Sequence, residues 1–392
     1  MDEFAVPRPE HDAEEPQVDD PTITAISRHL ASVMDPELRL PITELGMVED
    51  IAVDAEGAAT VHIKLTIEGC PMRGRITDDV TAAAVRAPGV RSAHVVLGVM
   101  TPQERADLKT HLRGPGGARK NPFAQPDSLT RVYAVASGKG GVGKSSVTVN
   151  LACAMAEAGL RVGLVDADVH GFSVPALMGI TDKPTQLDEM ILPPVAYGVK
   201  VISIGMFLDD NRPVAWRGPM LHRAIEQFLT DVHFGDLDVL LLDLPPGTGD
   251  IAISVAQLLP GSQLLVVTTP QAAAAGIAER AGSLSQQTDQ RVAGVIENMG
   301  PMTMPDGSTF ALFGAGGGED VSRRLSESLE QHIPLLGTVP LDTALREAGD
   351  DGDPLVRSAP NSPAGSALRE ISARLAHQPR GISGKPLPFG PA

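Results

Sequence analysis

One stretch of the chain indicates its fold before any other: Ser137-Gly138-Lys139-Gly140-Gly141-Val142-Gly143-Lys144-Ser145. An apolar run at residues 131–136 precedes it and predicts a buried strand, and residues 146–158 after it predict a helix. A glycine-rich loop between a strand and a helix is typical of a phosphate-binding loop. Glycines let backbone N–H groups turn inward without Cβ clashes, and the helix N-terminus adds partial positive charge at the same point. The stretch therefore predicts a nucleotide-binding α/β domain.

Three side chains of this loop have predicted roles. Lys144 is placed to reach the β- and γ-phosphates of a nucleotide, and the Ser145 hydroxyl is placed to hold Mg²⁺. Lys139 is a second lysine, at a position that is free in an ordinary phosphate loop. We expect it to face away from Lys144, where it could reach a nucleotide held by a second subunit. The alternative, a flexible glycine-rich turn with a surface lysine, explains neither the full spacing nor the flanking strand and helix.

A second motif lies at residues 238–250, where four apolar residues are followed by Asp243. This pattern is typical of a strand that ends in an acid for Mg²⁺, and Asp243 is predicted to hold the ion through water. Two prolines stiffen the turn at residues 245–247, and the Gly247 N–H is expected to approach the γ-phosphate. Such a turn can report hydrolysis by moving when this contact is lost. A strand followed by a tight turn would explain neither the acid nor its position.

Two further segments place polar side chains at predicted strand ends. The apolar run at residues 161–165 leads into Asp166 and Asp168, and acids at the carboxyl ends of parallel strands lie at the ligand crevice. We expect Asp168 to orient the attacking water and Asp166 to support Mg²⁺ through its water shell, with loop capping as the alternative. Asn298 ends a predicted strand at residues 292–296, and its amide can pair with adenine or form a turn. No guanine-specifying Asn-Lys-x-Asp run lies nearby, which favours ATP.

The loop reads Lys-Gly-Gly-Val-Gly-Lys and resembles that of the deviant Walker A ATPases, which include partition and septum-site ATPases and the Mrp/ApbC iron–sulfur carriers. The segments at residues 168–175, 216–221 and 243–250 resemble the Mrp members in particular. His170 and Arg217 lie in the first two of these segments. We interpret the histidine as a solvated or packing residue and the arginine as a surface residue at a helix start.

The resemblance carries implications for three residues of the nucleotide site. It implies that Lys139 completes the site across an ATP-sandwich homodimer. It also implies that Asp168 is linked to water activation in a switch segment, and that Asn298 contacts adenine. The motif is specific for the group of ATPases and does not single out one member.

Residues 21–113 are predicted to form a small α+β domain, since helix-like and strand-like patterns alternate along them. The expected helices are residues 22–34, 72–87 and 102–112, and the expected strands are residues 47–53, 59–67 and 92–99. Cys70 precedes Pro71, which would open the second helix. A thiol at a helix N-terminus has its thiolate stabilised by free N–H groups, which suits a metal ligand or a nucleophile. A small buried apolar residue at a turn is the alternative.

Asp35-Pro36-Glu37 and Gly69-Cys70-Pro71 resemble features of the small domain of iron–sulfur assembly proteins, which often precedes Mrp ATPases. That domain usually has a cysteine at this place, so the resemblance makes Cys70 the candidate cluster ligand. Asp35 and Glu37 are better explained as residues of the turn that ends the first helix.

The chain departs from the Mrp pattern in one respect. Many Mrp proteins have a Cys-x-x-Cys pair shortly after the position of Asn298, and this chain has no cysteine there. Two such pairs would supply the four thiolates of a four-iron, four-sulfur cluster across the dimer. Cys153 is predicted to lie in the core, while Met302 and Met304 are weak ligands that we expect to pack in a loop. A cluster would therefore have to involve Cys70, with its symmetry mate and external thiols.

Composition divides the remainder of the chain. Residues 1–20 carry eight acidic side chains and three prolines, which predicts a disordered tail. Residues 114–128 are predicted to be a linker, because they are rich in glycine and proline. Residues 129–377 are predicted to form the P-loop NTPase domain, with a doubly wound, mainly parallel sheet. Residues 378–392 hold four prolines and three glycines and predict a second disordered tail.

The net charge of the chain limits the kinds of partner that it can bind. The chain has 32 basic and 49 acidic residues, a net charge of −17, which argues against nucleic acid or an anionic membrane as a partner. No run of membrane-spanning length and no signal sequence is found, and the C-terminal segment is not a basic amphipathic helix. We therefore expect a cytoplasmic protein.

The sequence thus predicts a slow Mg²⁺-dependent ATPase that acts as a homodimer and, as the Mrp resemblance implies, transfers iron–sulfur clusters to client apoproteins. A nucleotide-switched adaptor or scaffold dimer with no cluster of its own is the first alternative, and the missing Cys-x-x-Cys pair strengthens it. A positioning or partition-type ATPase acting on DNA or a membrane is the second. The acidic charge and the C-terminal segment weaken that interpretation.

Overall fold

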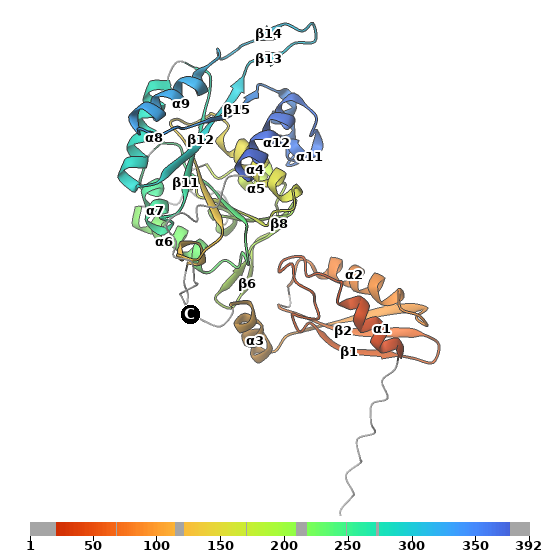
Figure 1. The fold of residues 1–392 in the computed structure, drawn as a ribbon. Helices are drawn as coiled ribbons and strands as arrows, with labels where there is room; N and C mark the ends of the chain where they lie inside the picture. Colours follow the sequence, from red (N-terminus) through yellow and green to blue (C-terminus); the bar gives the residue numbers. More distant parts are fainter. Residues whose placement is uncertain are drawn as a thin grey trace, which may run out of the picture. The chain divides into compact units, whose positions relative to one another are not determined.

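The computed structural model of the chain forms two compact units, Met1–Leu108 and Lys109–Ala392 (Figure 1). It describes residues 21–67, 69–113, 121–169, 171–208, 218–247, 249–271 and 274–376. Several sequence predictions fall outside these ranges: the tails at residues 1–20 and 378–392, residues 114–120 of the linker, and the interpretations of His170 and Arg217.

The small unit has the α+β architecture that its sequence predicts. It contains β1 (Val48–Val53), β2 (Ala58–Leu65), β3 (Ser92–Val99), α1 (Pro21–Leu30), α2 (Arg73–Val85) and the first part of α3 (Pro102–Arg113). β2 is the central strand, antiparallel to β1 and parallel to β3. Its alternate residues Ala59, Val61, Ile63 and Leu65 are buried, as the period of two along a strand requires. α1 and α2 cover this sheet and contribute Ile26 and Val80 to the same core.

The large unit is built on an eight-stranded sheet with the order β15-β12-β11-β4-β10-β5-β9-β8. The strands are β4 (Arg131–Ser137), β5 (Val162–Asp166), β8 (Val195–Ala196), β9 (Val199–Ser203), β10 (Val239–Asp243), β11 (Gln263–Thr268), β12 (Arg291–Gly300) and β15 (Leu335–Pro340). All neighbours pair in parallel except β8, which is antiparallel to β9. The predicted mainly parallel sheet is therefore confirmed.

Helices cover both faces of this sheet, so the sheet is doubly wound (Figure 1). One face carries α4 (Lys144–Glu157), α5 (Val174–Leu177), α10 (Thr343–Asp350), α11 (Leu355–Ser358) and α12 (Pro363–Ala376). The other face carries α6 (Gly218–Thr230), α7 (Asp250–Leu258), α8 (Ala274–Thr288) and α9 (Gly317–Ser328). Burial on both faces explains why β4, β5 and β10 are continuous apolar runs instead of alternating patterns.

Strand register positions the candidate site. β10 lies between β4 and β5, and its last residue, Asp243, is paired with Val135 of β4 and with Asp166 of β5. Two acids from different sequence motifs therefore end neighbouring strands at the same level of the sheet. The glycine loop leaves β4 two residues beyond Val135, after Ser137, at the same edge. Loops at this carboxyl edge of a parallel sheet are where ligands bind.

The prediction that Asn298 ends its strand is wrong. β12 continues to Gly300, which pairs with Pro340 of β15 beyond an irregularity that begins at Glu297. Met299, within that irregularity, has a φ of +58°, so the strand bends at this point and then resumes its pairing. The continued pairing with β15 is what carries β12 past Asn298.

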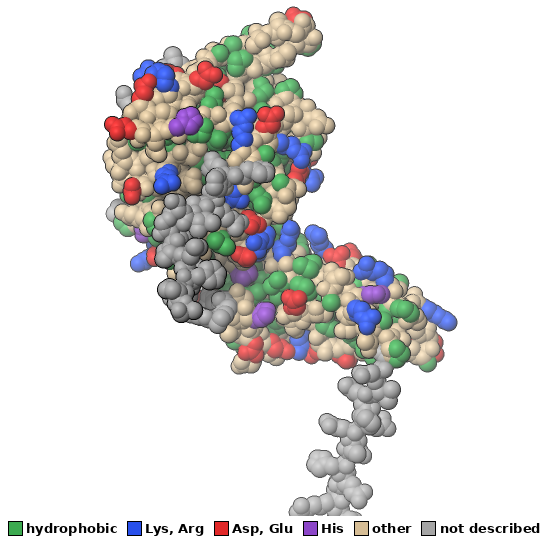
Figure 2. Space-filling view, viewed as in Figure 1, with side chains coloured by type: hydrophobic (Ala, Val, Ile, Leu, Met, Phe, Trp, Pro, Cys, Tyr) green, Lys and Arg blue, Asp and Glu red, His purple; other side chains and the backbone are tan. Residues whose placement is uncertain are grey.

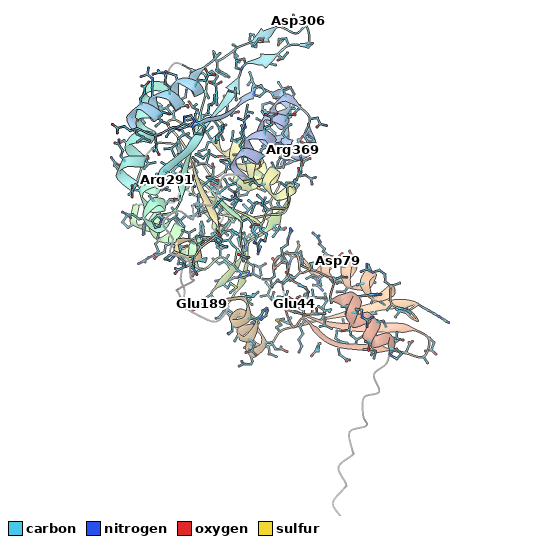
Figure 3. The ribbon with its side chains drawn as sticks, viewed as in Figure 1. Glu44, Asp79, Glu189, Arg291, Asp306 and Arg369 are labelled. Carbon is cyan, nitrogen blue, oxygen red and sulfur yellow. The ribbon has the colours of Figure 1, made fainter. Side chains whose placement is uncertain are left out.

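A hairpin of β13 (Met302–Thr303) and β14 (Thr309–Phe310) follows β12 and projects from the large unit, with Asp306 at its tip (Figure 3). Met304 on this hairpin is 37% exposed, so the loop packing expected for it is not observed. A second short hairpin, β6 (Thr185–Leu187) with β7 (Met190–Leu192), and the 3-10 turns Pro122–Ala124 and Ile204–Phe207 complete the described elements.

Acidic and basic side chains are interspersed over the visible face of the large unit, without one large patch of a single sign (Figure 2). None of the helices in the described ranges combines the length and the apolar character that crossing a membrane requires.

Candidate functional site

The glycine loop has a backbone that only glycine adopts without strain. Gly141 and Gly143 have φ angles of +74° and +75°, and α4 begins immediately after them at Lys144. A Cβ on Gly143 would lie 2.3 Å from Asn298 Nδ2, and a Cβ on Gly138 would lie 2.8 Å from Ile277 Cγ1. Gly141 and Gly143 are therefore required by their φ angles, and Gly138 and Gly143 by the close approach of neighbouring side chains.

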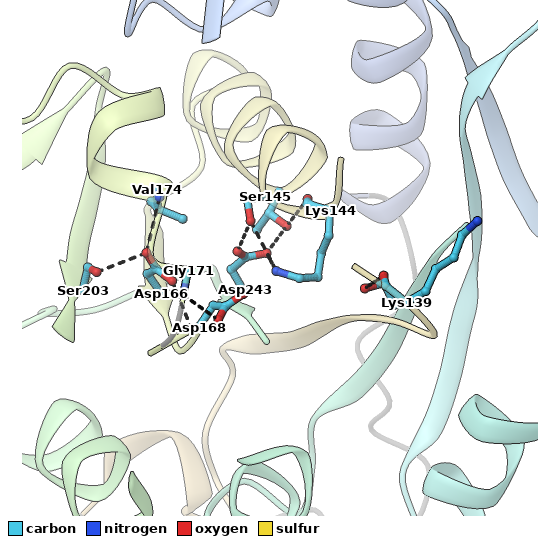
Figure 4. Close-up of polar contacts among 11 residues, drawn as sticks. Lys139, Lys144, Ser145, Asp166, Asp168, Gly171, Val174, Ser203 and Asp243 are labelled. Atoms are coloured by element: carbon cyan, nitrogen blue, oxygen red, sulfur yellow. Dashed lines mark hydrogen bonds and ion pairs between the residues drawn. The ribbon is translucent and has the colours of Figure 1, made fainter. Parts of the chain in front are cut away.

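A buried cluster joins the loop to the end of β10 (Figure 4). Lys144 Nζ lies 2.7 Å from Asp243 Oδ1, and the two side chains are 6% and 0% exposed. The Ser145 hydroxyl donates a hydrogen bond to Asp243 Oδ2. The structure thus brings together the lysine, the hydroxyl and the carboxylate that the sequence identified in two separate motifs.

Thr148 belongs to the same cluster and was missed by the sequence analysis. Its hydroxyl lies 2.9 Å from Asp243 Oδ1 and 2.8 Å from the Lys144 carbonyl oxygen, and it is fully buried. The sequence feature that could have identified Thr148 is its position four residues after Lys144, which places both side chains on one face of α4. Thr148 helps to hold the Asp243 carboxylate in place.

Asp166, the last residue of β5, and Asp168 accept hydrogen bonds from nearby backbone N–H groups and, for Asp166, from a hydroxyl. Asp166 Oδ1 accepts a hydrogen bond from the Asp168 N–H at 3.1 Å, and Oδ2 accepts from Ser203 Oγ at 3.1 Å and the Val174 N–H at 3.3 Å. Burial, reinforced by the charge of Asp243, raises the pKa of Asp166 to about 7. Asp168 Oδ1 accepts from the Gly171 N–H at 3.1 Å. Both acids therefore cap their loop while they lie beside Asp243 (Figure 4).

The turn after β10 is attached to the start of the glycine loop. The Gly247 N–H, which we expected to face a γ-phosphate, donates to the Ser137 carbonyl oxygen at 2.9 Å, and Gly247 has a φ of +91°. In this conformation the N–H is therefore engaged within the protein, because the turn folds back on the residue that ends β4.

Asn298 contacts the loop directly. Its Nδ2 donates to the Val142 carbonyl oxygen at 2.9 Å, and the side chain is 3% exposed. A cavity of about 250 Å³ opens beside this contact and is lined in part by Gly143, Asn298, Pro340, Leu341 and Arg346. Asn298 thus lies between the loop and a cavity at its side.

Lys139 is directed away from the buried cluster, as the sequence predicts (Figure 4). Its Nζ donates to Gln271 Oε1, in the loop that follows β11. The Ser137 hydroxyl donates to the Lys139 carbonyl oxygen at 3.0 Å. The two lysines of the loop therefore point in different directions, one into the cluster and one outward.

Cys70 in the small unit does not have the chemistry that its sequence position suggested. Its side chain is 5% exposed, and this burial raises the pKa of the thiol above its usual value. A hydrogen bond with the Met72 backbone lowers the pKa, as predicted for a helix start, but burial and the charges of Glu37 and Asp35 outweigh it. The prediction of a stabilised thiolate is therefore wrong for this conformation. Asp35 has the expected turn role, since its Oδ1 accepts from the Glu37 and Leu38 N–H groups at 2.9 and 2.7 Å.

Cys153 is fully buried in α4, and burial raises the pKa of its thiol to about 12, which agrees with the predicted core position. Both cysteines of the chain are free thiols. Within the part of the chain that the structure describes, no group of three or more His, Cys, Asp or Glu side chains is arranged to hold a metal ion.

A glycine loop between the central strand of a parallel sheet and a helix, with a buried acid at the end of the next strand, defines a P-loop NTPase. Comparisons with known proteins identify the family. Residues 128–376 match the family model described as the NUBPL iron-transfer P-loop NTPase, and residues 23–95 match the model of an iron–sulfur cluster assembly protein. The chain belongs to the NUBPL iron-transfer P-loop NTPase family.

Curated relatives and one solved structure agree with this family. A protein of Mycobacterium tuberculosis named iron-sulfur cluster carrier protein is 59% identical over 367 residues, 94% of this chain and 96% of the relative. A Synechocystis protein of the same name is 39% identical over 91% of this chain and 97% of the relative. A nucleotide-binding protein from Archaeoglobus fulgidus, solved in complex with ADP, is 31% identical with a TM-score of 0.51 over 69% of this chain and 98% of that one. The predicted family, fold class and assignment as an ATP hydrolase are confirmed.

The raised pKa of Cys70 predicts slow alkylation. At pH 8 iodoacetamide should modify this residue more slowly than the cysteine of an unstructured peptide, because less of the thiol is ionised. The rate should continue to rise at pH values where the peptide rate has levelled off. Peptide mass mapping measures it, with Cys153 as an internal core control and urea-unfolded protein as the reference. A Cys70 rate equal to that of the peptide at pH 8 would show that the thiol is not masked.

Proposed function

We propose that this chain is a Mg²⁺-dependent ATPase that works as a homodimer and carries iron–sulfur clusters to client apoproteins. The observation that carries the ATPase part is the buried cluster of Lys144, Ser145 and Asp243 at the edge of the sheet. The carrier part is supported by the two relatives named iron-sulfur cluster carrier protein. The match to this chain covers 96% of one relative and 97% of the other.

The loop from Gly138 to Ser145 is proposed to bind the phosphates of ATP. Ile277 and Asn298 leave no room for a Cβ at Gly138 and Gly143, and the positive φ of Gly141 and Gly143 fits a loop that turns main-chain N–H groups toward an anion. Lys144 would exchange Asp243 for the β- and γ-phosphates. Its ammonium is already desolvated, so its attraction to phosphate is strong in this site.

The donors around Asp243 fit Mg²⁺, a hard cation that takes oxygen ligands. Ser145 Oγ would hold the ion directly and Asp243 through water, and Asp166 would orient its water shell. The ion would supply charge neutralisation at the phosphates. Mg²⁺ in nucleotide sites is typically bound by one or two protein oxygens together with substrate phosphates, which matches the small number of donors here.

Asp168 is proposed to orient the attacking water, since it lies beside Asp166 and Asp243 and is 9% exposed. Gly247 is proposed to contact the γ-phosphate after its N–H leaves the Ser137 carbonyl oxygen. The turn would then return to Ser137 when the γ-phosphate departs, so its position would report hydrolysis.

Asn298 and the cavity of about 250 Å³ beside it are proposed to bind adenine. Nδ2 can stay on Val142 while Oδ1 accepts a hydrogen bond from the exocyclic amine of the base. The apolar side chains of Pro340 and Leu341 would pack against the ring.

Cys70 is proposed as the point at which this chain holds its cluster cargo. The chain has only two cysteines, and Cys153 is inert in the core. Because one thiol cannot hold a cluster, Cys70 of both copies and external thiols would be needed. The burial of Cys70 specifically favours a second candidate, a nucleotide-switched adaptor without a cluster of its own.

We further propose the cytoplasm as the compartment, with client proteins and not nucleic acid or membranes as partners. Two unpaired thiols fit a reducing compartment, and the net charge of −17 disfavours polyanions.

Replacing Lys144 tests the ATPase site. Lys144→Ala should lower ATP turnover at least about 100-fold, because the cation that meets the phosphates is lost. The change also leaves Asp243 buried without its partner, so Lys144→Gln and a thermal melt should accompany it. Lys183→Ala, at an exposed lysine before β6, is the control and should retain activity. Wild-type turnover in a folded Lys144→Ala protein would remove this site from the mechanism.

Replacing Lys139 tests the homodimer. Lys139→Ala should bind ATP within about threefold of wild type, since its side chain points away from the loop's own nucleotide position. It should lose ATP-dependent dimerisation and hydrolysis. Light scattering with ATP and a phosphate-release assay measure both, with Lys183→Ala again as control. Normal dimerisation and turnover together would show that Lys139 does not act across an interface.

Replacing Cys70 tests the cargo site. Anaerobic cluster reconstitution of wild type should give bound iron and the visible absorbance of a cluster, and Cys70→Ala should lose most of both. Cys153→Ala is the matched control, because its thiol lies in the core. Equal iron in wild type and Cys70→Ala would exclude the proposed ligand. No iron in the wild type would favour the adaptor.

A further inference from the structure

Helix α8 supports the first part of the glycine loop through two side chains. Arg280 Nη1 donates to the Gly138 carbonyl oxygen at 2.6 Å, across 142 residues of sequence. Ile277 lies so close to Gly138 that a Cβ there would be 3.0 Å from Ile277 Cα. These two residues are three apart on α8 and therefore share one face of the helix.

The contact with Arg280 determines the orientation of one peptide group. In a trans peptide the carbonyl oxygen and the following N–H point in opposite directions. Because Arg280 holds the Gly138 carbonyl oxygen toward α8, the Lys139 N–H is turned to the opposite side.

Two other carbonyl groups of the loop are held in a similar way. The Ser137 hydroxyl donates to the Lys139 carbonyl oxygen, and Asn298 Nδ2 donates to the Val142 carbonyl oxygen. Side-chain donors thus occupy carbonyl oxygens that would otherwise be free to rotate toward an anion and repel it. A loop whose peptides are oriented before the anion arrives needs little reorganisation to bind it.

We propose that Arg280 is a positioning residue for the nucleotide site: it fixes the Gly138–Lys139 peptide in the orientation that binds phosphate. This inference rests on the proposed binding of ATP by the loop. Arg280 acts through the backbone of Gly138 and does not itself contact the nucleotide. Its charge strengthens the hydrogen bond, since bonds from an ionised donor are about twice as strong as neutral ones.

The same segment also holds the side chain of Lys139, through Gln271 in the loop that leads into α8. Arg280 therefore holds the peptide group that precedes the outward-pointing lysine, and Gln271 accepts from its ammonium. Both contacts come from residues that follow β11, Gln271 and Arg280, and together they set the direction of Lys139.

The test is nucleotide affinity in the full-length protein, measured by isothermal titration calorimetry with ADP and with a non-hydrolysable ATP analogue, each with Mg²⁺. Arg280→Ala and Arg280→Gln should weaken binding about tenfold or more, because the peptide is no longer held. Arg280→Lys keeps a charged donor and should recover binding to within about threefold of wild type. The matched control is Arg291→Ala, at the exposed start of β12 and so at the opposite edge of the sheet (Figure 3).

A merely structural role would give a different result. In that case Arg280→Gln would lower the thermal midpoint of the nucleotide-free protein, and Arg280→Lys would not restore affinity. The inference expects an unchanged midpoint together with lysine rescue, and wild-type affinity in Arg280→Ala and Arg280→Gln would overturn it. Failure of the proposed ATP binding would give a different result from failure of the Arg280 inference, because the wild-type protein itself would then bind no nucleotide.

Discussion

The ion pair between Lys144 and Asp243 is the interaction on which the large unit's site depends. It joins the loop after β4 to the end of β10, and both charges are almost completely removed from water. Removing one partner of such a pair leaves an uncompensated buried charge, at a cost of about 3–5 kcal/mol. A ligand that takes Lys144 must therefore leave Asp243 with another positive charge. A triphosphate that arrives with a divalent cation satisfies both groups at once. The triphosphate alone would pair only with Lys144, and the cation alone only with Asp243.

That requirement explains the polar contacts around the pair. Ser145 and Thr148 donate to the two oxygens of Asp243, so the carboxylate keeps its orientation while its ionic partner changes. Asp166 is held by three donors of its own and stays in place at the neighbouring strand end. Arg280 of α8 and Asn298 likewise hold two carbonyl groups of the loop in fixed orientations. The groups that face the anion are thus each held by a neighbouring donor, whereas Lys144 and the Gly247 N–H are the groups that would exchange partners.

Most of this site could be predicted from sequence because it depends on local patterns. Glycine spacing, apolar runs and acids at strand ends are enough to identify Lys144, Ser145, Asp166 and Asp243 from the sequence. Arg280 could not be found in this way, because its contact spans 142 residues and depends on how α8 packs. The pKa of the Cys70 thiol cannot be predicted from the sequence for a related reason. The helix start is evident from Pro71, but burial and the nearby carboxylates of Glu37 and Asp35 depend on the tertiary structure.

The turn after β10 carries a hydrogen bond that the proposed nucleotide binding would exchange for another. The Gly247 N–H now bonds to the Ser137 carbonyl oxygen, and contact with a γ-phosphate would replace that bond with another. Exchanging one hydrogen bond for another changes the free energy by much less than forming one from an unpaired group. A ligand can shift the equilibrium between two conformations of the turn only by the difference in its affinity for them. Two conformations of nearly equal free energy therefore respond most readily to the ligand. The engagement of Gly247 with Ser137 is therefore the feature that would let loss of one phosphate move the turn.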